Sequence, residues 1–372
     1  MRYYLVAGEA SGDLHASNLI RGLRAEDPQA AFRFRGGEKM LEAAQDPAAL
    51  TQHYREGAVM GVTDVLRRAG KLIRSLRECE RDILAWRPDA VILVDYPGFN
   101  LRLAKSLHSK GLKVFYYIAP KTWASRPGRN SLLRKCLDGL FIVFPFEKEY
   151  FDRAGVPYVY RGNPLLDAVD AHRYDRVCVE PYIALLPGSR KGEISRMMPV
   201  CMEAARRLGR KVVIAGAPGR SLSDYERFIR PDDDALVLFD RTYDILKWAG
   251  AAVINSGTAS LEAALIGTPQ VVGWSTSPMT FFVAKRILRV GSRIRFISLG
   301  NLILGREAFR ELIQGDLTAD ALVPEVTSLL EDGSRRDRMI ADYADIRSAL
   351  GGSGASRAVA AAMIERMSNN SI

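Results

Sequence analysis

Asp95 is the residue of this sequence best placed for general-base chemistry. It directly follows the apolar run 90–94, and Pro97 and Gly98 then turn the chain toward a helix. A carboxylate at the end of a buried strand lies in a low-dielectric environment, where its affinity for a proton rises into the range that suits a base at neutral pH. The alternative is that Asp95 caps the helix from Phe99 onward.

Two segments in the second half of the chain have the residue types that bind anions. One is "LLPGSRKGEI", which breaks an apolar run at a Pro-Gly pair and brings Arg190 ahead of a helix. The other is "NSGTASLEAAL", which places Ser256, Gly257 and Thr258 at a helix start and Glu262 one turn later. Backbone N–H groups at a helix start, together with a guanidinium, bind phosphate well. Either segment alone is consistent with helix capping, but the two together favour a nucleotide diphosphate site.

Two loops in the first half leave their role open. The first apolar run, residues 3–7, ends in "AGEASGD", where small residues allow either a close approach to a ligand or an ordinary tight turn. Its spacing matches neither the dinucleotide-binding fingerprint nor a P-loop, so both are disfavoured. The later segment "YYIAPKTWASRPGR" combines a tryptophan with two arginines, and both stacking and anion binding are open to it.

These residues follow apolar runs that alternate with amphipathic stretches, which predicts an α/β fold with doubly wound parallel sheets. The alternation restarts after Asp167. We therefore expect two Rossmann-like domains facing a cleft, at residues 1–170 and 171–345, with a C-terminal helix and tail, 346–372, packing back across the domains.

The amino-acid composition limits the classes of ligand and partner that the protein is expected to bind. Lys and Arg number 53 against 43 Asp and Glu, a net charge of +10, so the surface should attract anions. No nucleic-acid-binding module accompanies the charge, and we predict no nucleic-acid partner. The four histidines lack metal-ligand spacing, so we predict no metal. The four scattered cysteines and the lack of an apolar leader indicate a reduced cytoplasmic protein, and no apolar run is long enough to cross a bilayer.

One basic stretch, residues 278–296, has the composition of a membrane-contacting surface. It contains no acidic residue and mixes aromatic with basic side chains, which suits acidic head groups with shallow apolar insertion. The residues predicted to touch the membrane are Phe281, Phe282, Arg286, Arg289 and Arg293. A second basic stretch, 64–77, is better explained as a solvated amphipathic helix.

Nine motifs taken together resemble the lipid-A-disaccharide synthase family, inverting glycosyltransferases of the GT-B type. They run in the family's order from about residue 3 to residue 310, and the set is far more specific than any single member. The motifs are "AGEASGDLH", "MGVTDVL", "VDYPGFNLRLAK", "YYIAPKTWA", "FPFEKEYF", "RGNPLLD", "LLPGSRKGEI", "NSGTASLEAAL" and "NLILGRE".

The resemblance implies a reaction, a place and roles for residues. A 2,3-diacylglucosamine unit would pass from UDP-2,3-diacylglucosamine to 2,3-diacylglucosamine 1-phosphate, with inversion, without a cofactor, at the inner face of the cytoplasmic membrane. By position, Asp95 matches the family's proposed base. The other matched or proposed substrate contacts are Glu9 and Ser11 on the acceptor side, Arg190 and Ser256–Thr258 for the leaving charge, Glu262 for the ribose, and Asn301.

The chain departs from the family pattern at four positions, Gly98, Lys121, Ser125 and Asn163, which affects the expected acceptor contacts. Two other functions are compatible with the residues. One is a UDP-sugar 2-epimerase of the hydrolysing type, which needs no membrane surface. The other is a non-catalytic peripheral membrane protein that senses UDP-sugars. Assembly as a homodimer is also left open by the sequence.

Overall fold

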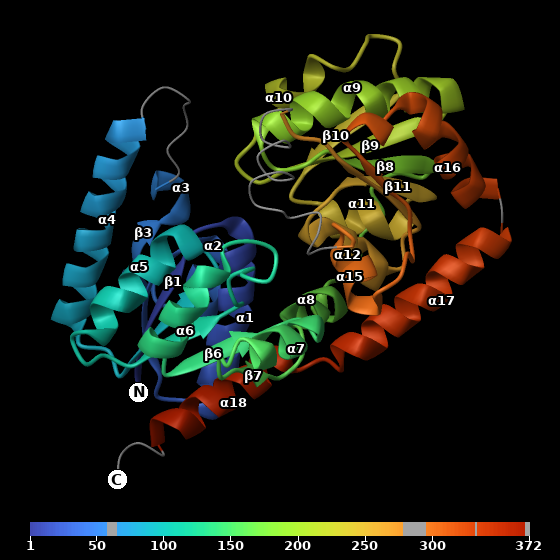
Figure 1. The fold of residues 1–372 in the computed structure, drawn as a ribbon. Helices are drawn as coiled ribbons and strands as arrows, with labels where there is room; N and C mark the ends of the chain where they lie inside the picture. Colours follow the sequence, from blue (N-terminus) through green and yellow to red (C-terminus); the bar gives the residue numbers. More distant parts are fainter. Residues whose placement is uncertain (58–64, 278–294, 332, 369–372) are drawn as a thin grey trace. The chain divides into compact units, whose positions relative to one another are not determined.

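The computed structural model describes residues 1–57, 65–277, 295–331 and 333–368, and the chain divides into two compact units (Figure 1). Unit 1 comprises Met1–Ala168 and Gly352–Ile372, and unit 2 comprises Val169–Gly351. The sequence placed these boundaries at 170 and 345. The second one lies later in the structure because helix α17 continues to Leu350 before the glycine-rich turn.

Unit 1 is built on a seven-stranded, all-parallel sheet with the strand order β3-β2-β1-β4-β5-β6-β7. Strand β4 is buried at every position, which explains its unbroken apolar sequence: a parallel strand covered on both faces has no solvent side. The strands are β1 Arg2–Ala7, β2 Ala31–Gly36, β3 Leu50–His53, β4 Ala90–Val94, β5 Val114–Tyr117, β6 Gly139–Ile142 and β7 Val159–Tyr160.

Helices cover both faces of this sheet. The C-terminal helix α18 packs against α1, so the end of the described chain belongs to the first unit (Figure 1). The helices are α1 Ala10–Glu26, α2 Glu38–Ala44, α3 Tyr54–Gly57, α4 Val65–Trp86, α5 Pro97–His108, α6 Asn130–Cys136, α7 Phe146–Arg153, α8 Pro164–Ala171 and α18 Ala355–Ser368, with short 3₁₀ turns η1 Pro47–Ala49 and η2 Pro127–Arg129.

Unit 2 is built on a six-stranded parallel sheet with the order β10-β9-β8-β11-β12-β13. Its strands are β8 Tyr182–Leu186, β9 Lys211–Gly216, β10 Ala235–Phe239, β11 Ala251–Asn255, β12 Gln270–Trp274 and β13 Glu311–Ile313. Its helices are α9 Lys191–Leu208, α10 Ser223–Glu226, α11 Thr242–Trp248, α12 Thr258–Ile266, α15 Leu299–Leu304, α16 Ala319–Glu331 and α17 Gly333–Leu350, with the 3₁₀ turn η4 Gln314–Asp316.

Both sheets reverse their strand order at one point, between β1 and β4 in unit 1 and between β8 and β11 in unit 2. This is the Rossmann arrangement, and the predicted doubly wound α/β fold is confirmed in each unit. In such sheets, ligands bind beyond the carboxyl ends of the two strands that flank the reversal. We therefore expect ligands to bind at the loops after β1, β4, β8 and β11. These loops carry the motifs described in the sequence analysis.

Candidate active site

In unit 1, the loops after β1 and β4 touch each other. The parallel pairing sets Ala7 beside Val94, so Gly8 and Asp95 leave the sheet next to each other. A Cβ atom on Gly8 would lie 2.3 Å from the ring of Tyr96, so glycine is required for this close approach. The "AGEASGD" turn is therefore needed to bring the start of α1 against the loop that carries Asp95.

The backbone at Asp95 is held in an unusual conformation. Asp95 and Tyr96 have φ values of 45° and 50°, in the left-handed region that costs a non-glycine residue energy. Two buried donors hold the Asp95 carbonyl oxygen in place: Asn100 Nδ2 at 2.8 Å and the Tyr116 hydroxyl at 2.5 Å. No side chain caps α5, so the alternative role for Asp95 as a helix cap is wrong.

The surroundings of the Asp95 carboxyl favour its protonated form. Burial raises its pKa, the charge of Glu9 raises it further, and the ammonium group of Lys121 opposes both. A raised pKa agrees with the expectation for a general base at a strand end. Lys121 is therefore the described positive charge that lowers the proton affinity of Asp95.

The loop that carries Lys121 is anchored by a buried glutamate that sequence reasoning missed. Glu147 is 1% exposed and accepts hydrogen bonds from Trp123 Nε1 at 3.2 Å and from the backbone N–H groups of Val143 and Phe144 at 3.1 Å. Burial raises its pKa to about 7. The Trp123 ring also packs edge-on against Phe146, so this tryptophan holds the loop onto the unit. The sequence signal was an acidic residue inside the aromatic motif "FPFEKEYF".

Glu9 and Ser11, both predicted to contact the acceptor, are exposed at the start of α1. Glu9 occupies the N-cap position without a side-chain capping bond, so its carboxylate is not used by the helix. Asp13, in the first turn of this helix, accepts backbone hydrogen bonds from Gly37 and Met40 at the start of α2.

In unit 2, the loops after β8 and β11 also meet. Gly188 has a φ of +109°, and a Cβ atom there would lie 2.7 Å from Glu193 Oε2 and 2.9 Å from Asn255 Nδ2. Only glycine combines this backbone conformation with this lack of space. The two segments expected to form one anion site are thus adjacent.

The loop after β8 already binds a carboxylate in this structure. Glu193 Oε2 accepts hydrogen bonds from the backbone N–H groups of Ser189 and Arg190, at 3.0 and 3.2 Å. The Arg190 guanidinium, which is exposed, donates to Glu193 Oε1 at 3.0 Å. The backbone groups expected to hold a phosphate are therefore occupied by an anionic side chain of the protein itself.

At the start of α12, the simple helix-capping interpretation is wrong. The Ser256 hydroxyl donates to the carbonyl oxygen of Ile297 at 3.0 Å, and Gly257 is an N-cap with no side-chain capping bond. Thr258 is the first residue of the helix and is half-buried. Glu262 accepts a 3.2 Å hydrogen bond from the hydroxyl of Tyr243 on α11, a neighbour that the sequence did not indicate.

Asn301 does not fit the substrate contact expected from the resemblance. It is 0% exposed; its Nδ2 donates to Phe309 O and Glu311 Oε1 at 2.9 Å. Its Oδ1 accepts from the backbone N–H of Ala308 and, at 3.3 Å, of Phe309. Because its hydrogen-bonding groups are used internally, we correct its role to support of the segment that leads into β13.

Several expectations concern residues outside the described ranges. The predicted membrane contacts Phe281, Phe282, Arg286, Arg289 and Arg293 all lie there. Among the described residues, no helix is both long and apolar enough to span a bilayer, and no group of three or more His, Cys, Asp or Glu side chains is arranged to hold a metal ion.

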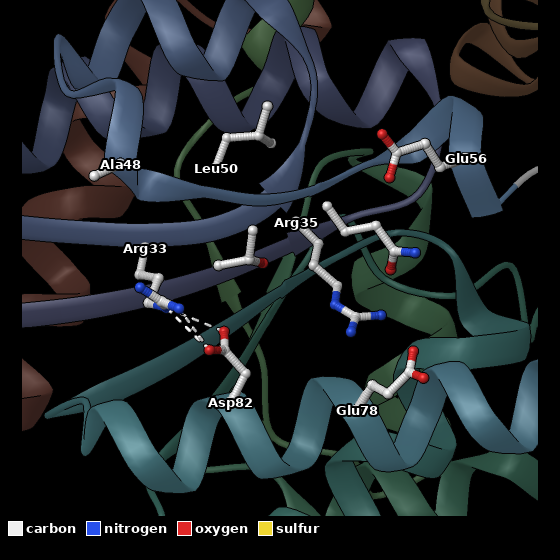
Figure 2. A pocket seen from close by; sticks show the side chains of 9 residues that line it. Arg33, Arg35, Ala48, Leu50, Glu56, Glu78 and Asp82 are labelled. Atoms are coloured by element: carbon white, nitrogen blue, oxygen red, sulfur yellow. Dashed lines mark hydrogen bonds and ion pairs between the residues drawn. The ribbon is translucent and has the colours of Figure 1, made fainter.

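A hollow of about 390 Å³ lies along β2 and β3, at the edge of the sheet in unit 1 (Figure 2). Figure 2 shows Arg33 joined to Asp82 of α4; the two shortest contacts are 2.7 and 3.1 Å. Arg35 donates to the backbone and hydroxyl oxygens of Ser75 on the same helix. Both arginines are engaged by α4, and we place no substrate there.

Comparisons with known proteins identify the family. The family model described as lipid-A-disaccharide synthetase matches residues 3–364. The lipid-A-disaccharide synthase of Myxococcus xanthus is 37% identical, covering 98% of this chain and 97% of that protein, and the one from Geobacter sulfurreducens is 34% identical with the same coverage. The chain belongs to the lipid-A-disaccharide synthetase family. The resemblance drawn from nine motifs is confirmed, and the chain is a glycosyltransferase.

Solved structures support the fold of this family member. The UDP-GlcNAc 2-epimerase of Neisseria meningitidis, bound to UDP-GlcNAc, has a TM-score of 0.67 at 12% identity, covering 98% of this chain and all of the other. The calicheamicin glycosyltransferase CalG4 has a TM-score of 0.59 at 15% identity, covering 100% of this chain and 99% of that one. At such low identity these likenesses concern the fold alone, so the epimerase alternative has only structural resemblance behind it.

Proposed function

We propose that this chain transfers 2,3-diacylglucosamine from UDP-2,3-diacylglucosamine to 2,3-diacylglucosamine 1-phosphate and releases UDP. Family membership gives the reaction class. The observation that carries the proposal onto this chain is Asp95, which follows the strand at the reversal point of the first sheet, has a raised pKa and is left unused by helix α5. A β-1,6-linked disaccharide phosphate is the expected product.

In this mechanism Asp95 takes the proton from the acceptor 6-hydroxyl. The freed oxygen pair forms a bond to the anomeric carbon of the donor, while the bond from that carbon to the UDP oxygen breaks and its electrons leave with UDP. One displacement of this kind inverts the anomeric centre. The transition state has oxocarbenium character, as in glycoside hydrolysis, and negative charge builds on the diphosphate. Glu9 and Ser11 contact the acceptor sugar.

Unit 2 receives the donor nucleotide. We assign the diphosphate to the loop after β8 and to the start of α12, where Arg190 and the Ser256–Thr258 turn stabilise the leaving charge. In the structure, Glu193 accepts hydrogen bonds from the backbone N–H groups of Ser189 and Arg190. When the donor binds, a phosphate oxygen takes the position of this carboxylate oxygen and accepts the same two hydrogen bonds. Glu262 holds the ribose hydroxyls, with its carboxylate oriented by Tyr243.

Acylated substrates place the enzyme at the inner face of the cytoplasmic membrane. The basic and aromatic stretch 278–296 is our candidate for contact with anionic lipid. Binding to anionic liposomes should weaken as salt rises and should be lost when Arg289 and Arg293 are both changed to Gln. Binding that is insensitive to salt and to these changes counts against this surface.

The experiment that tests the function is UDP release in detergent. We expect UDP only when both acylated sugars are present, and a disaccharide phosphate in equal amount. UDP-GlcNAc incubated without acceptor separates the competing enzyme: epimerisation at C2 supports the 2-epimerase alternative. No turnover with any of these sugars leaves the non-catalytic sensor as the better description.

A further inference from the structure

Three arginines lie on the segments that follow β4 and β5, and the mechanism above does not use them. Arg102 lies on α5 one turn after Gly98, and its NH1 donates to the Gly98 carbonyl oxygen at 3.1 Å. Arg126 and Arg129 come from the loop and 3₁₀ turn η2, which leads into α6, and α6 packs beside α5 (Figure 1). Two segments more than twenty residues apart thus bring three positive charges together.

The three charges are close enough to act on one another. Burial lowers the pKa of Arg129, and the positive charges of Arg126 and Arg102 lower it further. In the part of the chain that the structure describes, no carboxylate pairs with any of the three. Elsewhere in the same unit, by contrast, Arg33 pairs with Asp82 and Arg55 with Glu38. Like charges held together without counter-charges are unfavourable unless an anion joins them.

This arginine cluster is linked to Asp95 through one tyrosine. The Tyr116 hydroxyl donates to the Asp95 carbonyl oxygen at 2.5 Å. The same phenol lies within reach of two charges: Asp95 raises its pKa and Arg129 lowers it, after the larger effect of burial. Arg102 and Arg126 are exposed and Arg129 is half-buried, so a ligand from solution has access to all three.

The backbone that presents the cluster is fixed at both ends. Trp123, before the arginines, is bonded to buried Glu147. After them, Asn130 Nδ2 donates to the Tyr150 hydroxyl at 2.8 Å, and Ser131 Oγ donates to the Gly128 carbonyl oxygen at 3.1 Å. The guanidiniums are therefore presented from an ordered support, as a binding site requires.

We propose that Arg102, Arg126 and Arg129 form the binding site for the phosphate monoester of the acceptor sugar. This inference rests on the proposed function, in which one sugar carries both the attacking 6-hydroxyl and the 1-phosphate. Its phosphate must then lie near Asp95. Arg102 bonds to Gly98, three residues after Asp95, and Arg129 acts on the Tyr116 phenol that bonds to the Asp95 carbonyl oxygen. Guanidiniums donate paired hydrogen bonds that match phosphate oxygens, and a dianionic phosphate supplies the missing counter-charge.

The test compares two acceptors, 2,3-diacylglucosamine 1-phosphate and the same lipid without phosphate, in the UDP-release assay. The variants are Arg102→Gln, Arg126→Gln, Arg129→Gln and the triple. Each single change should lower kcat/KM for the phosphorylated acceptor by roughly tenfold, the effect of losing one charge-assisted hydrogen bond. The rate with the phosphate-free acceptor and the KM of the donor should stay within about twofold of the wild type, because neither involves the site.

Arg134→Gln is the matched control, since Arg134 is an exposed arginine on α6 whose guanidinium faces Gly155. It should keep the wild-type preference for the phosphorylated acceptor. Arg129→Lys, which restores charge without the paired donors, should recover part of that preference. A thermal unfolding curve checks that each variant folds; should the triple variant unfold, the exposed Arg102 and Arg126 variants decide.

A binding measurement separates this inference from the proposed function. Calorimetry with glucosamine 1-phosphate should show binding to the wild type and at least about tenfold weaker binding to the triple variant. If glucosamine 1-phosphate binds through the arginines but no UDP is released in the assay, the proposed transferase function is refuted and the phosphate site stands. Turnover with an undiminished preference for the phosphorylated acceptor in the triple variant overturns the site and keeps the function.

Discussion

The hydroxyl of Tyr116 donates a 2.5 Å hydrogen bond to the main-chain carbonyl oxygen of Asp95. This bond joins β5 to the loop after β4, and it acts on a residue whose φ of 45° is unfavourable without support. Burial and the charge of Asp95 raise the pKa of Tyr116 well above its ordinary value, so the phenol remains a neutral donor. Tyr116 is therefore a positioning residue for the base.

Tyr116→Phe should lower kcat by roughly tenfold with little change in either KM, because a base displaced by a fraction of an ångström still permits binding but transfers the proton less well. The pH at which activity begins should stay the same. Tyr117→Phe is the matched control: Tyr117 is the next residue of the same strand, and it bonds to Asp95 through its main-chain carbonyl oxygen, which accepts from the Asp95 N–H at 3.0 Å and is kept in the variant. Equal losses in the two variants contradict the positioning role.

Lys121 should set the acidic limb of the pH–rate profile. Its positive charge lowers the pKa of Asp95, against burial, which raises it. In Lys121→Gln the pKa of Asp95 therefore rises. Because the base works only when deprotonated, activity at low pH falls and the limb of kcat/KM moves to higher pH. Lys148→Gln, which removes a charge over the Tyr160 ring, should leave the limb in place. A shift to lower pH in Lys121→Gln refutes the assigned role.

Glu147 and Trp123 should act on acceptor use as one unit. In Glu147→Gln, the new amide NH₂ faces backbone N–H donors or the indole N–H, since the carboxylate accepts from all three. A buried mismatch of this kind costs about 1–3 kcal/mol, and the loop with Lys121 and the arginine cluster loosens. We expect kcat/KM for the acceptor to fall in Glu147→Gln and in Trp123→Phe, and to fall no further in the double variant. Fully additive losses disprove the shared role.

His15 should make the protein less stable in mild acid. It is 6% exposed on α1, and burial lowers its pKa to about 4 although Asp167 opposes the shift. At pH values above the pKa of the unfolded state, near 6.5, the imidazole is neutral in both the folded and the unfolded protein, so His15 does not change the free energy of unfolding. As the pH falls below that value, only the unfolded state takes up the proton, so the free energy of unfolding falls.

When the pH is lowered from about 7.5 to about 5, the free energy of unfolding of the wild type should fall by about 2 kcal/mol more than that of His15→Asn. Urea unfolding of the full chain at the two pH values measures the difference. His108→Asn, at an exposed position on α5, should behave as the wild type. An identical pH dependence in wild type and His15→Asn contradicts a neutral buried imidazole.

The sequence predicted the strand ends well because buried parallel strands are continuously apolar. The runs that became β4 and β11 could be read directly, and so could the polar residues that follow them, Asp95 and Ser256. Since parallel strands end at the same edge of a sheet, the topology then brings such residues together. That part of the candidate site needed only local pattern.

Contacts between distant segments could not be predicted in the same way. Asp13 accepts a hydrogen bond from the start of a helix that lies more than twenty residues later in the chain. The side chain of Asn301 bonds to the loop that follows its own helix. Glu147 and the meeting of Arg102 with Arg129 likewise depend on which helices pack side by side. Neither periodicity nor a motif fixes such packing, since it follows from the crossover order of the sheet.

Turnover of Asp95→Asn, measured together with its affinity for UDP, decides whether Asp95 is the base. The amide keeps the shape of the side chain but cannot accept the proton of the acceptor hydroxyl. We expect kcat to fall by roughly a hundredfold or more while the Kd for UDP stays near that of the wild type. Turnover within a few-fold of the wild type would show that Asp95 is not the base.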